Sequence, residues 1–182
     1  EEFKARRYTL LGTLYREDPV PEPAGKYDIP AVRPKGWAIA GFEIDGMKLN
    51  LKVGRWETDG VKEIWELLPE KGLQIEWNYP YVGNDVYLVM EGAVHVKADG
   101  HDFTAGKRDV INIPPYYKHT LTVLEEGTVI YAYNVQSCLM HVMERLKAEK
   151  IRTPENLKDW GYVEKILREN NCWVTGIRKI TV

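Results

Sequence analysis

A carboxylate, a phenol and an imidazole, Asp85, Tyr87 and His119, have the types and spacing that suit proton transfer. An imidazole titrates near neutral pH, so His119 is the predicted general acid or base. Asp85 and Tyr87 continue an alternation that begins at Tyr79 and Tyr81, so all four side chains share one face if the segment is extended. Asp85 can then orient His119 or bind a substrate hydroxyl. We therefore predict a pocket in which His119, Asp85 and Tyr87 are catalytic.

Aromatic side chains are predicted to form the wall of this pocket, because they stack on rings and donate phenolic hydrogen bonds. The alternative is that His119 is a satisfied core histidine and that the tyrosines are ordinary strand residues with high β propensity. The predicted substrate-binding residues are Tyr79, Tyr81, Trp77, Tyr131 and Tyr133.

Period-two patterns predict the strands that position these residues. In "GFEIDGMKLNLKV", Asp45-Gly46 lies between alternating runs and predicts a two-residue type I′ hairpin. The stretch "VKEIWELLPEKG" fits both helical and strand spacing, and its strand-like neighbours favour a strand. Five strand-length runs with regular turn signals follow between Val86 and Asn134, which indicates an antiparallel sandwich or barrel.

The segments on either side of these runs have different compositions. "DPVPEPAGKYDIPAVRP" holds five prolines and predicts an extended arm over the surface. After Tyr133 the apolar period becomes helical, and "CWVTGIRKITV" predicts a last strand that pairs with the barrel edge or with a second subunit. We predict one domain with an arm at 1–36, a barrel at 37–134, and helices with a final strand at 135–182.

Two segments carry a resemblance to a known family. "VYLVMEG" and "RDVINIPPYYKH" resemble the two motifs of the cupin superfamily, in which Pro114 and His119 match the second motif. The resemblance covers roughly residues 73–134. It implies a mainly β fold, a double-stranded antiparallel β-barrel (jelly roll) of the RmlC-like cupin type, here with C-terminal α-helices.

The motif positions that usually bind a metal in cupins are substituted in this sequence. Tyr79 and Tyr81 stand where the resemblance places two histidines, and Asp85 stands at the glutamate position; only His119 is retained. Phenols are poor replacements for imidazoles near neutral pH, so we expect no metal and no other cofactor. The alternative is a β-bulge that regroups Glu76, His95 and His119 around a metal.

Composition excludes some classes of partner. The 182 residues carry a formal net charge of −2 and 44% hydrophobic residues, which favours one globular domain and disfavours nucleic acid. No apolar run approaches the length of a membrane helix, and the N-terminal segment lacks a secretory pattern. Cys138 and Cys172 match no CxxC spacing and are expected as reduced thiols in a cytoplasmic protein, a disulfide being the alternative.

Three functions remain open at this point. The first is a metal-independent isomerase, lyase, hydrolase or cyclase that uses His119 as acid or base on a cyclic or aromatic, oxygen-rich small molecule. The second is a metal-dependent dioxygenase or lyase with a rearranged site, and the third is a non-catalytic binding or sensing module. The resemblance also implies a homodimer.

Overall fold

The computed structural model describes residues 31–44, 46–54, 57, 62–77, 84–115, 117–134, 165 and 174–179. The first 30 residues of the predicted arm and the predicted helices lie outside these ranges, apart from Lys165. No helix in the described ranges has the length and apolar content that crossing a bilayer requires.

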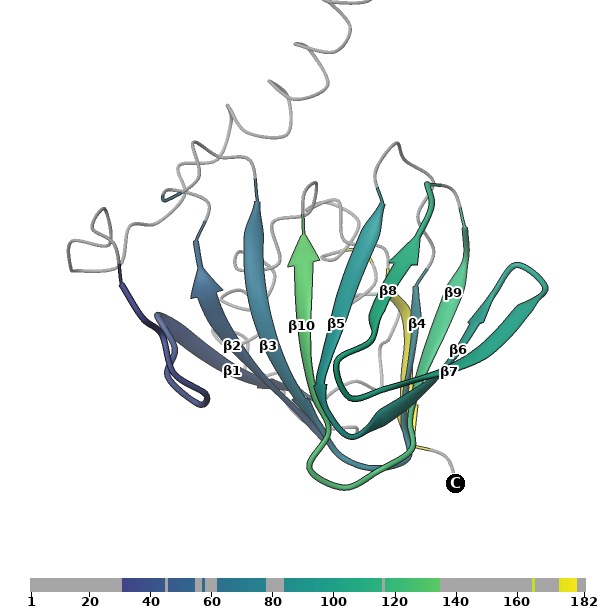
Figure 1. The fold of residues 1–182 in the computed structure, drawn as a ribbon, viewed down its shortest axis with the longest axis horizontal. Coiled ribbons are helices and arrows are strands. Elements are labelled where there is room, and N and C mark those ends of the chain that lie inside the picture. The colour runs from purple at the N-terminus through teal and green to yellow at the C-terminus, as the bar shows by residue number, and fades with distance from the viewer. Residues whose placement is uncertain are drawn as a thin grey trace, which may run out of the picture.

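Two antiparallel sheets face each other (Figure 1). Sheet A has the order β1-β2-β3-β10-β5-β8, and sheet B has the order β11-β4-β9-β6-β7. The bounds in sheet A are β1 Ala40–Ile44, β2 Met47–Val53, β3 Glu63–Pro69, β10 Val129–Asn134, β5 Asp85–Glu91 and β8 Val110–Ile113. Those in sheet B are β11 Val174–Lys179, β4 Leu73–Trp77, β9 His119–Val123, β6 Ala93–Ala98 and β7 His101–Gly106.

The predicted β architecture is confirmed, with one correction. Between Asp85 and Asn134 there are six strands, β5 to β10, where five were predicted, because five turns separate six strands. The predicted hairpin between β1 and β2 is present, with Ile44 opposite Met47 and Gly46 at φ 78°. The last strand, β11, pairs with β4 at the edge of sheet B.

The ambiguous stretch forms strand β3, and its burial explains the ambiguity. Trp65 and Leu67 face the core, while the neighbouring Glu66 on the opposite face is also buried. A strand that is covered on both faces reads as a nearly continuous apolar run, so its period of two is obscured.

The core lies between the two sheets and is made of their alternating inward residues. One row across sheet A joins Leu51, Trp65, Ala132, Tyr87 and Ile111, which are opposite one another on consecutive strands. Sheet B contributes Ile75, Val96 and Leu121 among others, and these residues belong to the same buried cluster. This alternation fixes which side chains of each strand face the interior.

Candidate functional site

Tyr87 and His119 meet in the interior and join the two sheets. The Tyr87 hydroxyl lies 2.9 Å from His119 Nε2, with Tyr87 on β5 of sheet A and His119 on β9 of sheet B. His119 Nδ1 lies 3.4 Å from the backbone oxygen of Tyr117. A carbonyl oxygen can only accept, so Nδ1 carries the hydrogen and Nε2 accepts from the Tyr87 hydroxyl.

Asp85 completes the group at the rim of the barrel. Its Oδ2 lies 3.9 Å from His119 Nε2, which is too long for a hydrogen bond. Asp85 begins β5 opposite Ile113 at the end of β8, and His119 begins β9 opposite Trp77 at the end of β4. These strand ends gather at the upper end of the barrel in Figure 1. The structure therefore brings together the three predicted catalytic residues, which we call the trio.

Members of the trio differ in exposure. The His119 side chain is fully buried and Tyr87 is 3% exposed, whereas 14% of the Asp85 side chain is accessible. Of the three, Asp85 is therefore the residue that a molecule at the rim meets first.

Burial shifts both titratable members of the trio toward their neutral forms. Desolvation raises the pKa of Asp85 from 3.8 to about 7. Desolvation also lowers the pKa of His119 from 6.5 to about 4, and the hydrogen bond to the Tyr117 carbonyl opposes this shift. In water the imidazole is the stronger base, but inside the barrel the carboxylate is. A single proton on the pair therefore resides on Asp85 between about pH 4 and pH 7.

Tyr131 and Tyr133 do not join the trio, which corrects their prediction as pocket residues. Their neighbour Ala132 lies opposite Tyr87 on the inner face, so the two tyrosines point to the outer face of sheet A. The Tyr131 hydroxyl donates to Glu66 Oε1 there, at 3.3 Å. Trp77 lies opposite His119 in the backbone register, and Tyr79 and Tyr81 lie outside the described residues.

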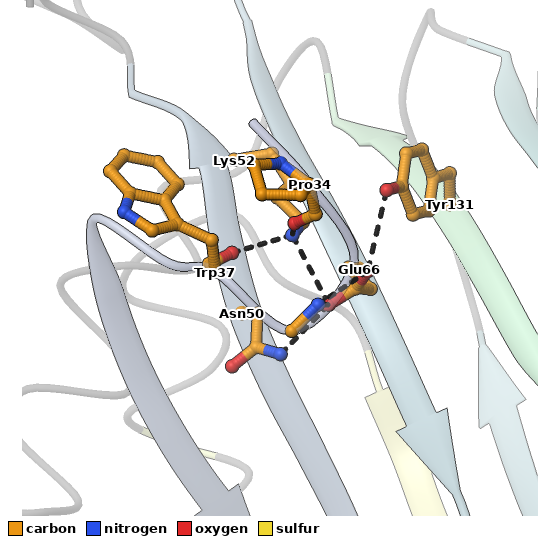
Figure 2. Close-up of polar contacts among 7 residues, drawn as sticks. Pro34, Trp37, Asn50, Lys52, Glu66 and Tyr131 are labelled. Carbon is orange, nitrogen blue, oxygen red and sulfur yellow. Dashed lines mark hydrogen bonds and ion pairs between the residues drawn. The ribbon is translucent and has the colours of Figure 1, made fainter. Parts of the chain in front are cut away.

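Two buried carboxylates were missed by the sequence reasoning. Glu63 faces the interior, where its Oε2 accepts a hydrogen bond of 2.8 Å from Trp65 Nε1. Glu66 is fully buried on the outer face, beside Lys52, Asn50 and Tyr131 (Figure 2). The available signal was a charged residue inside a strand whose neighbours are apolar, since such a charge needs partners.

Comparison with solved structures gives the fold. A predicted oxalate decarboxylase from Thermotoga maritima aligns over 58% of this chain and 98% of its own, with TM-score 0.50 and 9% identity. The barrel has the cupin fold. KdgF from Halomonas sp. aligns with TM-score 0.47 and 12% identity over 53% of this chain and 87% of its own. An RmlC-like cupin from Shewanella frigidimarina aligns with TM-score 0.42 and 20% identity over 52% and 84%. No protein-family model and no curated protein matches the chain.

Within the part of the barrel that the structure describes, the donor set does not fit a resident metal. Among the described residues, no three His, Cys, Asp or Glu side chains converge on one point. His119 Nε2, which would have to bind the ion, already accepts the Tyr87 hydrogen bond. A first-row metal prefers several imidazole, carboxylate or thiolate ligands, and the trio offers one of each of the first two.

The alternative metal site predicted from Glu76, His95 and His119 is wrong. Glu76 lies opposite Thr120, and His95 lies opposite Thr122, so both point to the outer face of sheet B while His119 points inward. His95 instead contacts the carboxylate of Asp102 on β7. No bulge interrupts the β4–β9 or β6–β9 register that would be needed to regroup them.

Removing metal from the purified protein is therefore expected to leave its stability unchanged. Dialysis against a strong chelator should not move the melting temperature, because a ligand bound only to the folded state would have raised it by mass action. Metal analysis before dialysis is the matching measurement. One tightly held equivalent per chain, whose loss lowers the melting temperature, would contradict the expectation.

A surface pocket lies near the same rim but on the outer side of sheet B. Its volume is about 290 Å³. Its lining residues are Glu76, Lys97, Ala98, Asp99, Gly100, His101, Asp102, Lys118, His119 and Thr120. His119 is the one member of the trio that lines it, whereas Asp85 and Tyr87 do not, so this pocket does not enclose the whole trio.

Proposed function

We propose that this chain is a small-molecule enzyme that transfers a proton without a resident metal, as an isomerase, lyase, hydrolase or cyclase. The observation that carries the proposal is the trio, a carboxyl, a phenol and an imidazole gathered at one rim of a cupin barrel. The substrate class that we propose is a cyclic or aromatic, oxygen-rich molecule, because the accessible carboxyl of Asp85 can hydrogen-bond to its oxygens.

Asp85 is the proton carrier in this proposal. It is the accessible member of the trio, and its pKa of about 7 allows it to accept a proton and return it near neutral pH. The deprotonated carboxylate removes a proton from substrate carbon or hydroxyl, and the carboxylic acid formed delivers that proton to the product. The sequence suggested His119 for this role, but its lowered pKa makes it a weak base near neutral pH.

His119 and Tyr87 act behind Asp85 as positioning residues. The neutral imidazole accepts from the Tyr87 hydroxyl and so fixes the direction of that hydrogen, while the Tyr117 carbonyl fixes the tautomer of the ring. Since the imidazole stays uncharged, it does not lower the pKa of Asp85 as a cation at 3.9 Å would. The arrangement keeps the carboxyl poised near neutrality.

Hydrogen exchange into a substrate tests this function without knowledge of the product. The wild-type protein is incubated in heavy water with a panel of lactones, cyclitols and catechols, and mass spectrometry detects deuterium washed into carbon positions. We expect Asp85→Asn to lower the rate by at least about 100-fold, the usual contribution of an acid or base. Asp102→Asn, an exposed carboxylate on the outer face of sheet B, is the matched control and should retain full activity.

The burial of Tyr87 and His119 favours a second candidate, a non-catalytic small-molecule binding module. Compounds of the same panel that raise the melting temperature without any deuterium incorporation would support that module and contradict the enzyme. Equal incorporation by wild type and Asp85→Asn would contradict the role of the trio.

A further inference from the structure

Residues 33–37, which we call the strap, cross the outer face of sheet A and are held there by two buried side chains. Lys52 Nζ donates to the backbone oxygens of Pro34 at 2.7 Å and Trp37 at 2.5 Å (Figure 2). Glu66 Oε2 accepts from the backbone N–H of Gly36 at 3.0 Å. Lys52 and Glu66 also pair with each other at 3.3 Å. The strap is thus fastened by its own backbone groups.

Further polar contacts support Glu66 beneath the strap and Arg33 at its start. Asn50 Nδ2 donates to Glu66 at 2.8 Å, and the Tyr131 hydroxyl donates to the other carboxylate oxygen at 3.3 Å. Arg33 donates to the backbone oxygen of Lys52 and pairs with Glu57. Asn50, Gly36, Lys52 and Tyr131 thus satisfy the buried Glu66 carboxylate. Desolvation raises the pKa of this carboxyl, but the hydrogen bonds from Asn50, Gly36 and Lys52 lower it, and the net shift is downward.

Apolar burial contributes little to holding the strap. Pro34, Lys35 and Gly36 are exposed, and Trp37 is 39% exposed. The inner-face residues of the strands beneath, such as Leu51 and Trp65, are packed by the core between the sheets. Packing against that core begins with Ile39, after the strap ends. Opening the strap therefore exposes polar contacts and leaves the core intact.

We propose that the strap is a releasable cover, and that the Lys52–Glu66 pair is the latch that closes it over β2 and β3. Removing one partner of a buried pair leaves an uncompensated charge, which is strongly unfavourable. Here water can reach that charge once the strap lifts, so local opening relieves the penalty and global unfolding is not required. Opening also uncovers Glu66, the central member of a row of hydrogen-bonding side chains in which Asn50 and Tyr131 lie opposite it on the neighbouring strands. The latch thereby controls access to this polar row.

Amide hydrogen exchange of the full chain tests the latch. We expect Glu66→Gln and Lys52→Met each to accelerate exchange at least about tenfold in the strap, where the N–H groups of Gly36 and Trp37 are bonded. Exchange in β5 and β9 should stay within about twofold of wild type. Lys107→Met, which removes the exposed pair with Glu91 at 2.8 Å, is the control and should leave the strap unchanged.

The wild-type chain supplies an independent measurement. The exchange rates of strap amides should not change at low denaturant concentration, because lifting the strap exposes no core surface. The exchange rates of β5 amides should rise with denaturant, because their opening exposes core surface. The proposal is overturned if neither variant accelerates the strap, or if β5 and β9 accelerate together with it. Failure of both variants to fold counts among these contrary results, because the pair would then support the whole barrel.

Discussion

Replacing Gly92 by alanine is expected to lower the free energy of unfolding by about 4 kcal/mol. Gly92 joins β5 to β6 at φ 76°, a left-handed conformation that costs a residue with a Cβ roughly 1–2 kcal/mol. The added methyl group would also lie 2.9 Å from Thr128 Cα and 3.0 Å from Thr128 Cβ. Thr128 is buried, and its hydroxyl donates to the Glu125 carbonyl at 2.7 Å, so it cannot easily move away. Overpacking of this kind costs about 1–3 kcal/mol more.

Gly100 provides the matched control for that substitution. Its φ of 84° imposes the same backbone conformation, but a Cβ there would meet no atom within 4 Å. Gly100→Ala should therefore lose only about 1–2 kcal/mol. Urea unfolding of both variants, with slopes equal to that of wild type, measures the difference. Equal losses for the two variants would show that the close approach of Thr128 does not matter.

The sequence was sufficient to predict the strands because their patterns are local. Asp45-Gly46 specifies a tight hairpin by turn chemistry, and the confirmed β architecture follows from period-two runs separated by glycine turns. The structure also brings Asp85, Tyr87 and His119 together at one rim. Alternation along one strand predicted that Asp85 and Tyr87 share a face, and the resemblance placed Asp85 and His119 at ligand positions of the two cupin motifs.

The sequence was not sufficient where partners on other strands decide the outcome. The face of Tyr131 depends on its register with β3 and β5, which places it beside Glu66 and away from Tyr87. The burial of Lys52 depends on the strap that lies over it, which is separated from it in the sequence. Neither fact is encoded by spacing within the segment itself.

Burial also decides which member of the trio holds the proton, and the sequence alone predicts the wrong member. The ordinary pKa values of the two groups in water favour the proton on His119, and desolvation moves it to Asp85. A ligand or water molecule that raises the local polarity would reduce both shifts and make the two proton affinities more equal.

Two opposing pH dependences of stability are expected from this inversion. Asp85 has a pKa that is raised on folding, so its contribution to stability is fully present below pH 3.8 and is lost as the pH rises to about 7. The loss amounts to about 4 kcal/mol. His119 has a pKa that is lowered on folding, so its contribution is present above pH 6.5 and is lost as the pH falls to about 4. This second loss is about 3 kcal/mol. Between pH 4 and pH 6.5 the two slopes nearly cancel.

Single substitutions should reveal each of these two pH dependences of stability, which nearly cancel in the wild-type protein. Asp85→Asn removes the first one, so the variant should gain stability relative to wild type by about 4 kcal/mol as the pH is raised from 4 to 8. His119→Gln removes the second, so that variant should gain about 3 kcal/mol relative to wild type as the pH is lowered from 7 to 4. Urea unfolding at each pH supplies both differences. If the two variants instead run parallel to wild type across this range, the carboxyl and the imidazole keep their solution proton affinities inside the barrel. Asp85 would then be ionised well below neutral pH and could not carry a proton in the proposed reaction.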